Sequence, residues 1–113
     1  MSIGLNDYQQ RAKQTAVYPG QGQQQGLAYV SIGLGGEAGE LFNVIAKHLR
    51  GDDLLEAYLP RIEQEVGGVL WFLSQVCEES GTTLEKCAEQ NLELLAARMK
   101  KGTIMGDGDG ERS

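Results

Sequence analysis

The chain lacks any long apolar run: no stretch approaches the roughly 18 to 20 consecutive apolar residues that a membrane-spanning helix needs. It also lacks an excess of basic residues, because 10 Lys and Arg against 16 Asp and Glu give a formal net charge of −6. Non-specific binding to nucleic acids needs clustered Lys and Arg. Neither a membrane nor a nucleic-acid polymer is therefore an expected partner, whereas an acidic chain suits the binding of divalent cations.

Targeting signals and cysteine patterns are sparse as well. The first seven residues do not place an apolar segment after a basic one, so we expect no secretory signal and a cytoplasmic location. The two cysteines, Cys77 and Cys87, have no metal-site spacing. In a chain without an export signal we expect both thiols to be reduced and mostly buried. Their equal separation from the turn near Thr82 leaves a disulfide between them open.

No segment shows the alternating apolar and polar residues of a half-buried strand, and no solenoid-type repeat is present. Apolar residues instead recur at intervals of three and four, the period of helices with one buried face. This pattern predicts four helices, over residues 5–16, 27–49, 60–79 and 83–101. Their short connections predict an antiparallel four-helix bundle. We expect one all-α domain over 1–101 and a Gly/Asp-rich tail over 102–113.

The ends of these helices carry signals of their own. Asn6 is a candidate N-cap of the first helix, and Pro60 fits the first turn of the third. Thr82 followed by Glu85 has the spacing of a capping box that opens the fourth helix. The second helix is expected to bury one stripe, made of Leu27, Val30, Leu34, Ala38, Leu41, Phe42, Ile45 and Leu49.

The centre of the second helix, Gly35–Glu40, combines two unfavourable features. Glu37 and Glu40 place like charges one turn apart on one helix face, where they repel. Each of the three glycines in this turn costs roughly 1 kcal/mol relative to alanine. A cation between the carboxylates and a close neighbour over the glycines would account for both features. Without a cation, the acid pair is solvated helix surface.

Further polar side chains border or interrupt the stripes of the later helices. Glu65 flanks the third stripe, while Asn91 and Arg98 fall inside the fourth. Together with Glu37 and Glu40, they are expected to converge on one side of the bundle. Three carboxylates without His or Cys favour Mg²⁺ or Mn²⁺ over zinc. The sequence therefore indicates a site for a hard divalent cation.

Several candidate residues keep an ordinary structural alternative. Asn91 fits either a ligand contact or a satisfied core amide, and Arg98 either a ligand contact or a pair with a glutamate. Lys47, two turns beyond the acids, is either a phosphate contact or a solvated lysine. We expect His48 at the surface. Trp71 lies off the third stripe, which suggests a subunit interface or stacking on a base.

Three segments carry a resemblance to a known family: Leu34–Leu41, Glu65–Phe72 and Asn91–Arg98. Together they resemble the MazG family of all-α nucleoside triphosphate pyrophosphohydrolases, and the resemblance covers nearly the whole chain. The family motif is Glu-x-x-Glu, a spacer and Glu-x-x-Asp. Its first three acids correspond to Glu37, Glu40 and Glu65 in this sequence.

The resemblance implies a Mg²⁺- or Mn²⁺-dependent enzyme that hydrolyses a (deoxy)nucleoside triphosphate to the monophosphate and pyrophosphate, with house-cleaning of non-canonical nucleotides as a possible role. It implies that Glu37, Glu40 and Glu65 hold the metal and form the catalytic centre. The residues expected to bind the substrate are Lys47, Asn91 and Arg98. The wide apolar faces of the long helices predict a homodimer or homotetramer.

Two positions depart from the family pattern. Gly68 stands where the fourth acid is expected, and Leu94 stands where a lysine is usual. Both changes remove groups that would hold metal or phosphate. They leave a second hypothesis open, in which a MazG-like protein of weakened or lost activity serves as a nucleotide-binding or interaction module. A water, or Asp107 or Asp109 from the tail, is the expected replacement ligand if activity is retained.

Overall fold

The structure is a computed structural model that describes residues 2–102. Within this range the chain forms four helices and no strand, which confirms the predicted all-helical class. The helices are α1 (Leu5–Gln14), α2 (Gln24–Leu49), α3 (Leu55–Ser80) and α4 (Leu84–Lys101). None of the described helices is long and apolar enough to cross a membrane. Nearly all of the predicted tail, with Asp107 and Asp109, lies outside the described residues.

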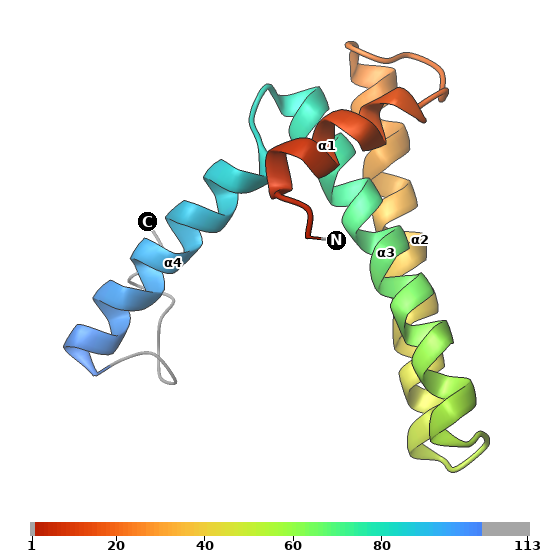
Figure 1. The fold of residues 1–113 in the computed structure, drawn as a ribbon. Coiled ribbons are helices and arrows are strands. Elements are labelled where there is room, and N and C mark those ends of the chain that lie inside the picture. The colour runs from red at the N-terminus through yellow and green to blue at the C-terminus, as the bar shows by residue number, and fades with distance from the viewer. Residues whose placement is uncertain (1, 103–113) are drawn as a thin grey trace.

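The helices α2 and α3 form a long antiparallel hairpin, in which two helices of 26 residues lie side by side (Figure 1). Helix α1 crosses α3 near its C-terminal end and contacts the start of α4. Helix α4 then leads away from the hairpin (Figure 1). The Cα radius of gyration is 16.8 Å, whereas a compact domain of this length has roughly 13 Å. Helix α4 thus packs at one end of the hairpin and not along its length.

The N-cap of α4, in the turn that follows α3, lies one residue later in the sequence than predicted. Gly81 ends α3 in the left-handed conformation, with φ of 75°. The N–H of Thr82 then donates to the carbonyl of Cys77 at 2.9 Å, which is the closing bond of a Schellman motif. Because Thr82 belongs to this closure, Thr83 is the N-cap of α4, and its hydroxyl accepts from the N–H of Lys86 at 3.1 Å. The predicted cap at Thr82 is wrong.

Helix α3 begins earlier than the proline signal predicts. It starts at Leu55, so Pro60 lies inside the helix and not in its first turn. The preceding turn is held by His48, whose Nδ1 lies 2.9 Å from Oδ1 of Asp53. Tyr58 in the first turn stacks on the His48 ring, with 3.9 Å between ring centroids. These contacts stabilise the residues before the proline, and they make His48 half-buried where we expected it at the surface.

The buried core of a single chain is small and centres on the α2–α3 contact. Val30 and Val44 of α2 are 0% and 3% exposed. Gly33 lies against the ring of Phe72 so closely that a Cβ at position 33 would overlap it. Glycine at this position therefore lets the two helices approach closely, which fixes the register of the hairpin.

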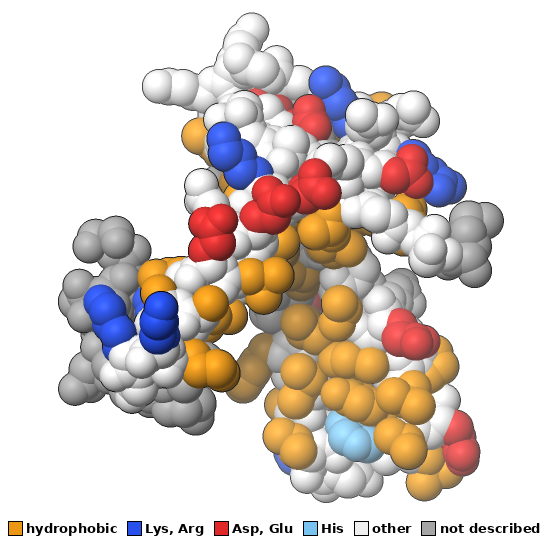
Figure 2. Space-filling view, turned by 60° about the vertical axis from the view of Figure 1, so that its left-hand side comes forward, with side chains coloured by type: hydrophobic (Ala, Val, Ile, Leu, Met, Phe, Trp, Pro, Cys, Tyr) orange, Lys and Arg blue, Asp and Glu red, His pale blue; other side chains and the backbone are white. Residues whose placement is uncertain are grey.

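The single buried stripe predicted for α2 is wrong at four of its positions, which are exposed: Leu27, Ala38, Phe42 and Leu49. Phe42 and Leu49 are 71% and 79% exposed, because α3 covers the face of Val30 and Val44 instead. Helix α2 therefore carries apolar residues on two faces, of which α3 covers one. Figure 2 shows hydrophobic side chains gathered on the lower part of the molecule, where Figure 1 places the joined ends of α2 and α3.

Candidate functional site

Three glutamates, which we call the acid cluster, lie near one another where α2 faces α3: Glu37, Glu40 and Glu65. Glu37 reaches from α2 to Gly68 of α3, so a Cβ at position 68 would lie 2.7 Å from its Oε2 atom. Glu65, one turn before Gly68, lies close enough to the Glu37 carboxyl group to raise its pKa, and the charge of Glu40 acts on the same group. The three predicted metal-binding acids are thus neighbours.

The environment of Glu37 favours its protonated form. Its pKa is raised above the ordinary value of 4.5, first because the side chain is partly desolvated and then because Glu65 and Glu40 repel its negative charge. A cation bound at this point would remove the repulsion among the three carboxylates.

The donor set matches a hard divalent ion in its chemistry, because all three groups are carboxylates. As the side chains stand, no three His, Cys, Asp or Glu residues within 2–102 are grouped closely enough to hold an ion. Glu40 is exposed, whereas Glu37 and Glu65 are half-buried. Binding therefore requires an inward turn of the Glu40 side chain.

The glycines of this region divide into two groups. A Cβ at Gly35, Gly36 or Gly39 would meet nothing within 4 Å in the described part of the chain. The predicted close neighbour over these three glycines is therefore not found within residues 2–102. The close approaches occur at Gly33 and Gly68, where Phe72 and Glu37 lie against the helix backbone.

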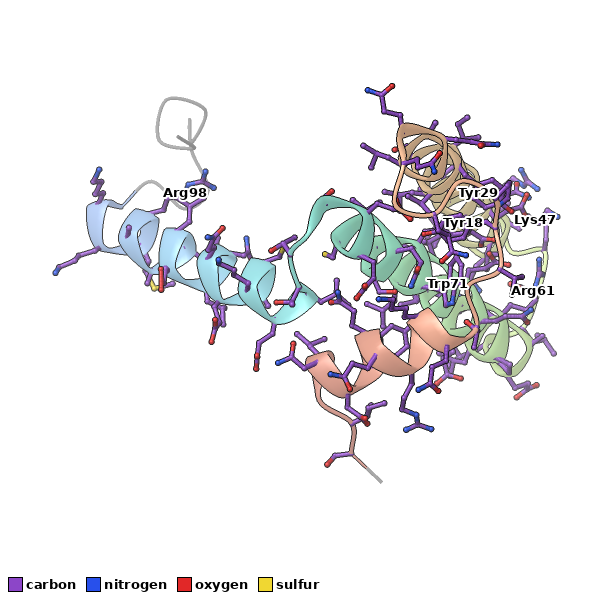
Figure 3. The ribbon with its side chains drawn as sticks, turned by 90° about the horizontal axis from the view of Figure 1, so that it is seen from above. Tyr18, Tyr29, Lys47, Arg61, Trp71 and Arg98 are labelled. Atoms are coloured by element: carbon purple, nitrogen blue, oxygen red, sulfur yellow. The ribbon has the colours of Figure 1, made fainter. Side chains whose placement is uncertain are left out.

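The predicted substrate-binding residues do not all lie near the acid cluster. Lys47 follows Glu40 by two turns on the same face of α2 and is half-buried. Asn91 and Arg98 belong to α4, which leads away from the hairpin, and Figure 3 shows Arg98 on the far side of the molecule from Lys47. Within one chain, Lys47 therefore lies on the same helix as Glu37 and Glu40. Asn91 and Arg98 lie apart from the acid cluster.

An apolar hollow of about 290 Å³ lies between α1 and α3, lined by Ile3, Tyr8, Arg11, Ala12, Thr15 and Trp71. Trp71 follows Gly68 by one helical turn, so the hollow lies close along α3 to the acid cluster. The indole N–H of Trp71 donates to the Thr15 hydroxyl at 2.8 Å, which orients the ring. Small-molecule sites are mostly apolar and start at about 300 Å³, so this hollow lies at the small end of that range.

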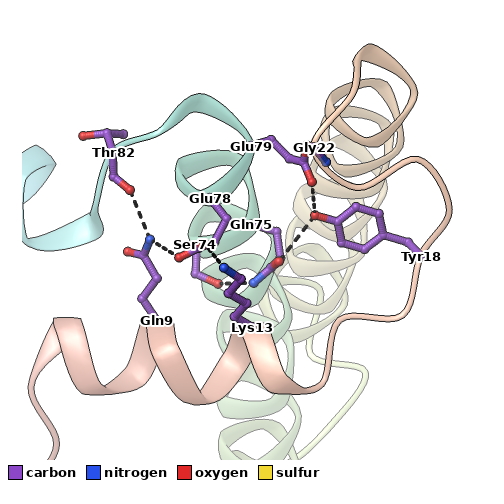
Figure 4. Close-up of polar contacts among 9 residues, drawn as sticks. All are labelled: Gln9, Lys13, Tyr18, Gly22, Ser74, Gln75, Glu78, Glu79 and Thr82. Carbon is purple, nitrogen blue, oxygen red and sulfur yellow. Dashed lines mark hydrogen bonds and ion pairs between the residues drawn. The ribbon is translucent and has the colours of Figure 1, made fainter.

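The loop between α1 and α2 is fixed to the end of α3 by Tyr18 (Figure 4). The Tyr18 hydroxyl donates to Oε2 of Glu79 at 2.6 Å, and the backbone N–H of Gly22 donates to Oε1 of the same carboxylate at 3.0 Å. The Tyr18 ring stacks on Tyr29 of α2 with 5.1 Å between centroids. Burial, followed by the contact with Glu79, raises the pKa of Tyr18. Tyr18 is thus a packing residue.

Gln9 joins α1 to the turn between α3 and α4 (Figure 4). Its side chain is 3% exposed, and Nε2 donates to Oε2 of Glu78 at 2.7 Å and to the carbonyl of Thr82 at 3.1 Å. Its Oε1 accepts from the N–H of Leu84, the first residue of α4, at 2.8 Å. Lys13 adds an ion pair with Glu78 at 3.3 Å. One amide therefore fixes where α4 begins.

Sequence reasoning missed this joint, although a signal for it exists. Glu78 and Glu79 stand in the last turn of α3 with no basic residue beside them, where the helix dipole disfavours acids. Acids at such a place indicate partners from other elements.

Asn6 was predicted as an N-cap, but Gly4 precedes α1 and the Asn6 side chain instead donates to Glu85 of α4 at 2.5 Å.

Comparison with known proteins gives one informative relative. The chain is 37% identical over 107 residues to the "Gene 37 protein" of Mycobacterium phage L5, an alignment that covers 90% of this chain and 94% of the phage protein. No family model and no solved structure matches the chain. The name of the phage protein states no substrate or reaction, so the chemistry has to be argued from the site.

Proposed function

The chain belongs to the family of the Gene 37 protein of Mycobacterium phage L5, and we propose that it is a MazG-like nucleoside triphosphate pyrophosphohydrolase. The proposed reaction is hydrolysis between the α- and β-phosphates of a (deoxy)nucleoside triphosphate, including non-canonical ones, which releases the monophosphate and pyrophosphate. One observation supports this proposal: Glu37 reaches across to Gly68, close enough to Glu65 and Glu40 that both raise its pKa.

The acid cluster is the part of the chain that would hold Mg²⁺ or Mn²⁺. When bound, such an ion neutralises phosphate charge and lowers the pKa of water. Lys47, on the same face of α2 as Glu40, would meet a phosphate oxygen. The hollow beside Trp71 would receive the base. These positions support binding of a triphosphate along the α2–α3 hairpin.

The predicted antiparallel bundle and the homodimer or homotetramer are part of the same proposal, as is a cytoplasmic location. A single chain exposes apolar side chains on the α2–α3 hairpin and on α4. Those on α4 include Leu92 and Met99, each 66% exposed. Assembly of several copies would cover such surfaces. Asn91 and Arg98 take part in substrate binding only where assembly brings an α4 helix to the acid cluster.

A second function is favoured by the position of Gly68. The Glu37 carboxylate occupies the space that a fourth acid would use, so the cluster has three acids and not four. A MazG-like protein with this site would bind a nucleotide or a partner protein without turning the nucleotide over. The two functions require the same fold and differ in whether the bound nucleotide is hydrolysed.

Pyrophosphate release from a panel of dNTPs and NTPs, with Mg²⁺ or Mn²⁺, separates the two. The proposed enzyme releases pyrophosphate from at least one of them, and Glu40→Ala abolishes the release. Glu63→Ala is the matched control, because Glu63 is an exposed acid on α3 outside the cluster. No turnover by the natural chain together with turnover by Gly68→Asp would refute the enzyme and support the binding module.

A further inference from the structure

The corner between α3 and α4 (Figure 1) brings the two cysteines of the chain together. Cys77 lies in the last turn of α3 and Cys87 in the first turn of α4, and their Sγ atoms are 4.0 Å apart. Both thiols are free. A disulfide requires the two sulfur atoms at about 2 Å, so rotation of the two side chains covers the remaining distance.

The backbone holds both cysteines at this corner. On one side of Gly81, the carbonyl of Cys77 accepts from the N–H of Thr82 at 2.9 Å. On the other side, the N–H of Cys87 donates to the carbonyl of Thr83 at 3.1 Å. Each cysteine is thus hydrogen-bonded to a residue of the turn, which keeps the two thiols near each other.

The two thiols differ in their access to solvent. Cys77 is 6% exposed, whereas Cys87 is exposed. A dissolved reagent therefore reaches Cys87 first, and Cys77 lies against the sulfur of Cys87. Thiol–disulfide exchange needs these two roles, an accessible thiol that attacks a disulfide and a second thiol that resolves the mixed disulfide.

The segment around the two thiols is acidic. Residues 77–89 contain one lysine, Lys86, and four glutamates: Glu78, Glu79, Glu85 and Glu89. Lys13 of α1 offsets one of these charges through its ion pair with Glu78 at 3.3 Å. The excess of negative charge attracts a cationic reagent to Cys87 and repels an anionic one.

We propose that Cys77 and Cys87 form a thiol–disulfide exchange site for small disulfides, cationic ones above all, and that the product is a bond that fixes α4 to α3. The Cys87 thiolate attacks one sulfur of the small disulfide, which forms a mixed disulfide and releases one half as a thiol. Cys77 then loses its proton, attacks the Cys87 sulfur and releases the second half. The two cysteines are oxidised to one disulfide, and the small disulfide is reduced to two thiols. This reaction is independent of the proposed hydrolysis.

A bond at this corner acts on the direction of α4. In the reduced chain that direction depends on the Gly81 turn and on the hydrogen bonds that Gln9 and Asn6 make with α4. The disulfide adds a covalent link between the last turn of α3 and the first turn of α4. Because α4 carries Asn91 and Arg98, oxidation fixes the position of both residues relative to the hairpin.

Cystamine, a cationic disulfide, is the probe for the full natural chain. After N-ethylmaleimide has blocked the remaining thiols, tryptic peptides are analysed by mass spectrometry without a reductant. Cleavage after Lys86 separates the two cysteines, so the oxidised chain should give peptides 62–86 and 87–98 joined by a disulfide that dithiothreitol breaks. A mixed disulfide that persists on Cys87, or a disulfide between two copies, would overturn the proposal.

Two variants test the order of the steps. Cys87→Ser changes an exposed side chain, and cystamine should leave its buried Cys77 unmodified in the folded chain and modify it in urea. Cys77→Ala should stop at the mixed disulfide on Cys87. Equal modification of Cys77 in folded and in urea-unfolded Cys87→Ser would show that Cys87 is not the point of entry, and the proposal would fall.

Salt tests the preference for a cationic disulfide. Between about 0.01 M and about 1 M salt the screening length falls from about 30 Å to about 3 Å. The rate with cystamine should fall over this range, and the rate with oxidised glutathione, which is anionic, should rise. Rates that do not change with salt would overturn the preference for cations.

Hydrogen exchange tests the effect on α4. In the oxidised chain the backbone amides of residues 84–87 should exchange at least about tenfold more slowly, because a disulfide restricts opening of the corner that it closes. The same sample after reduction with dithiothreitol is the matched control and should regain the original rates. Unchanged exchange in the fully oxidised chain would refute the claim that the bond fixes α4.

Discussion

At the scale of single residues, the account depends most on Glu37. Its carboxyl group lies against Gly68, and the charges of Glu65 and Glu40 act on it. A glycine at position 68 is required for this placement, since a Cβ there would stand 2.7 Å from Oε2 of Glu37. The glycine at position 68, where the family motif has an acid, thus has a structural explanation. The Glu37 carboxyl group occupies the space that the fourth acid would fill.

The raised pKa of Glu37 gives a pH dependence with a definite sign. A pKa that is higher in the folded state than its ordinary value of 4.5 stabilises the fold at low pH, and this contribution is lost as pH rises through the folded pKa. Glu37→Gln keeps the neutral form at every pH. In urea titrations the variant should match the natural chain near pH 4 and be the more stable of the two at pH 7.

Addition of Mg²⁺ or Mn²⁺ at pH 7 should stabilise the natural chain and leave Glu37→Gln nearly unchanged, because only the natural cluster gains a charge partner. Equal pH profiles for the two proteins would contradict a raised pKa of Glu37 in the folded state.

The two cysteines make a second prediction at this scale. Their sulfur atoms are 4.0 Å apart, and both thiols are free, with Cys77 buried and Cys87 exposed. The expectation that both are mostly buried is therefore wrong for Cys87. Burial, and then the contact with Cys87, raises the pKa of Cys77 to about 11. Iodoacetamide at pH 8 should modify Cys87 well before Cys77, as read by peptide mass spectrometry, and the reverse order would contradict this environment.

At the scale of helices, periodicity predicted the presence of all four and their order. It did not predict where a helix begins when a tertiary contact, and not the local sequence, fixes the first turn of that helix. Helix α3 starts at Leu55 because the His48–Asp53 pair and Tyr58 fix its first turn ahead of Pro60. Periodicity also merged two apolar faces of α2 into one stripe. Such faces can be separated only when the helix that covers each one is known.

The joint at Gln9 supplies the prediction for this scale. Gln9→Ala removes three hydrogen bonds and leaves the N–H of Leu84 and the carbonyl of Thr82 without that partner. We expect a loss of about 2 kcal/mol in the free energy of unfolding. Gln10→Ala, at an exposed neighbour on the same helix, should change it by less than about 0.5 kcal/mol. Equal urea midpoints for the two variants would show that the joint contributes no stability.

At the scale of the whole molecule, the sequence identified the acids that meet but not the relation of α4 to them. Glu37, Glu40 and Glu65 lie on two helices that pair along their length, so the helical period was enough to bring them together. Asn91 and Arg98 belong to a helix whose direction is set by the Gly81 turn and by Gln9. A direction of that kind depends on a few polar contacts and leaves no periodic signal.

The central claim is that the acid cluster binds a magnesium-type ion, and titration with Mn²⁺ followed by electron paramagnetic resonance tests it most directly. The natural chain and Glu63→Gln, an exposed acid on the same helix, should bind Mn²⁺ alike. Glu65→Gln should bind Mn²⁺ at least about tenfold more weakly than the natural chain. Removal of a residue that only supports a metal ligand weakens metal binding by about this factor, and removal of the ligand itself should weaken it at least as much. Equal Mn²⁺ affinity in Glu65→Gln and Glu63→Gln, or no binding by the natural chain, would contradict the account.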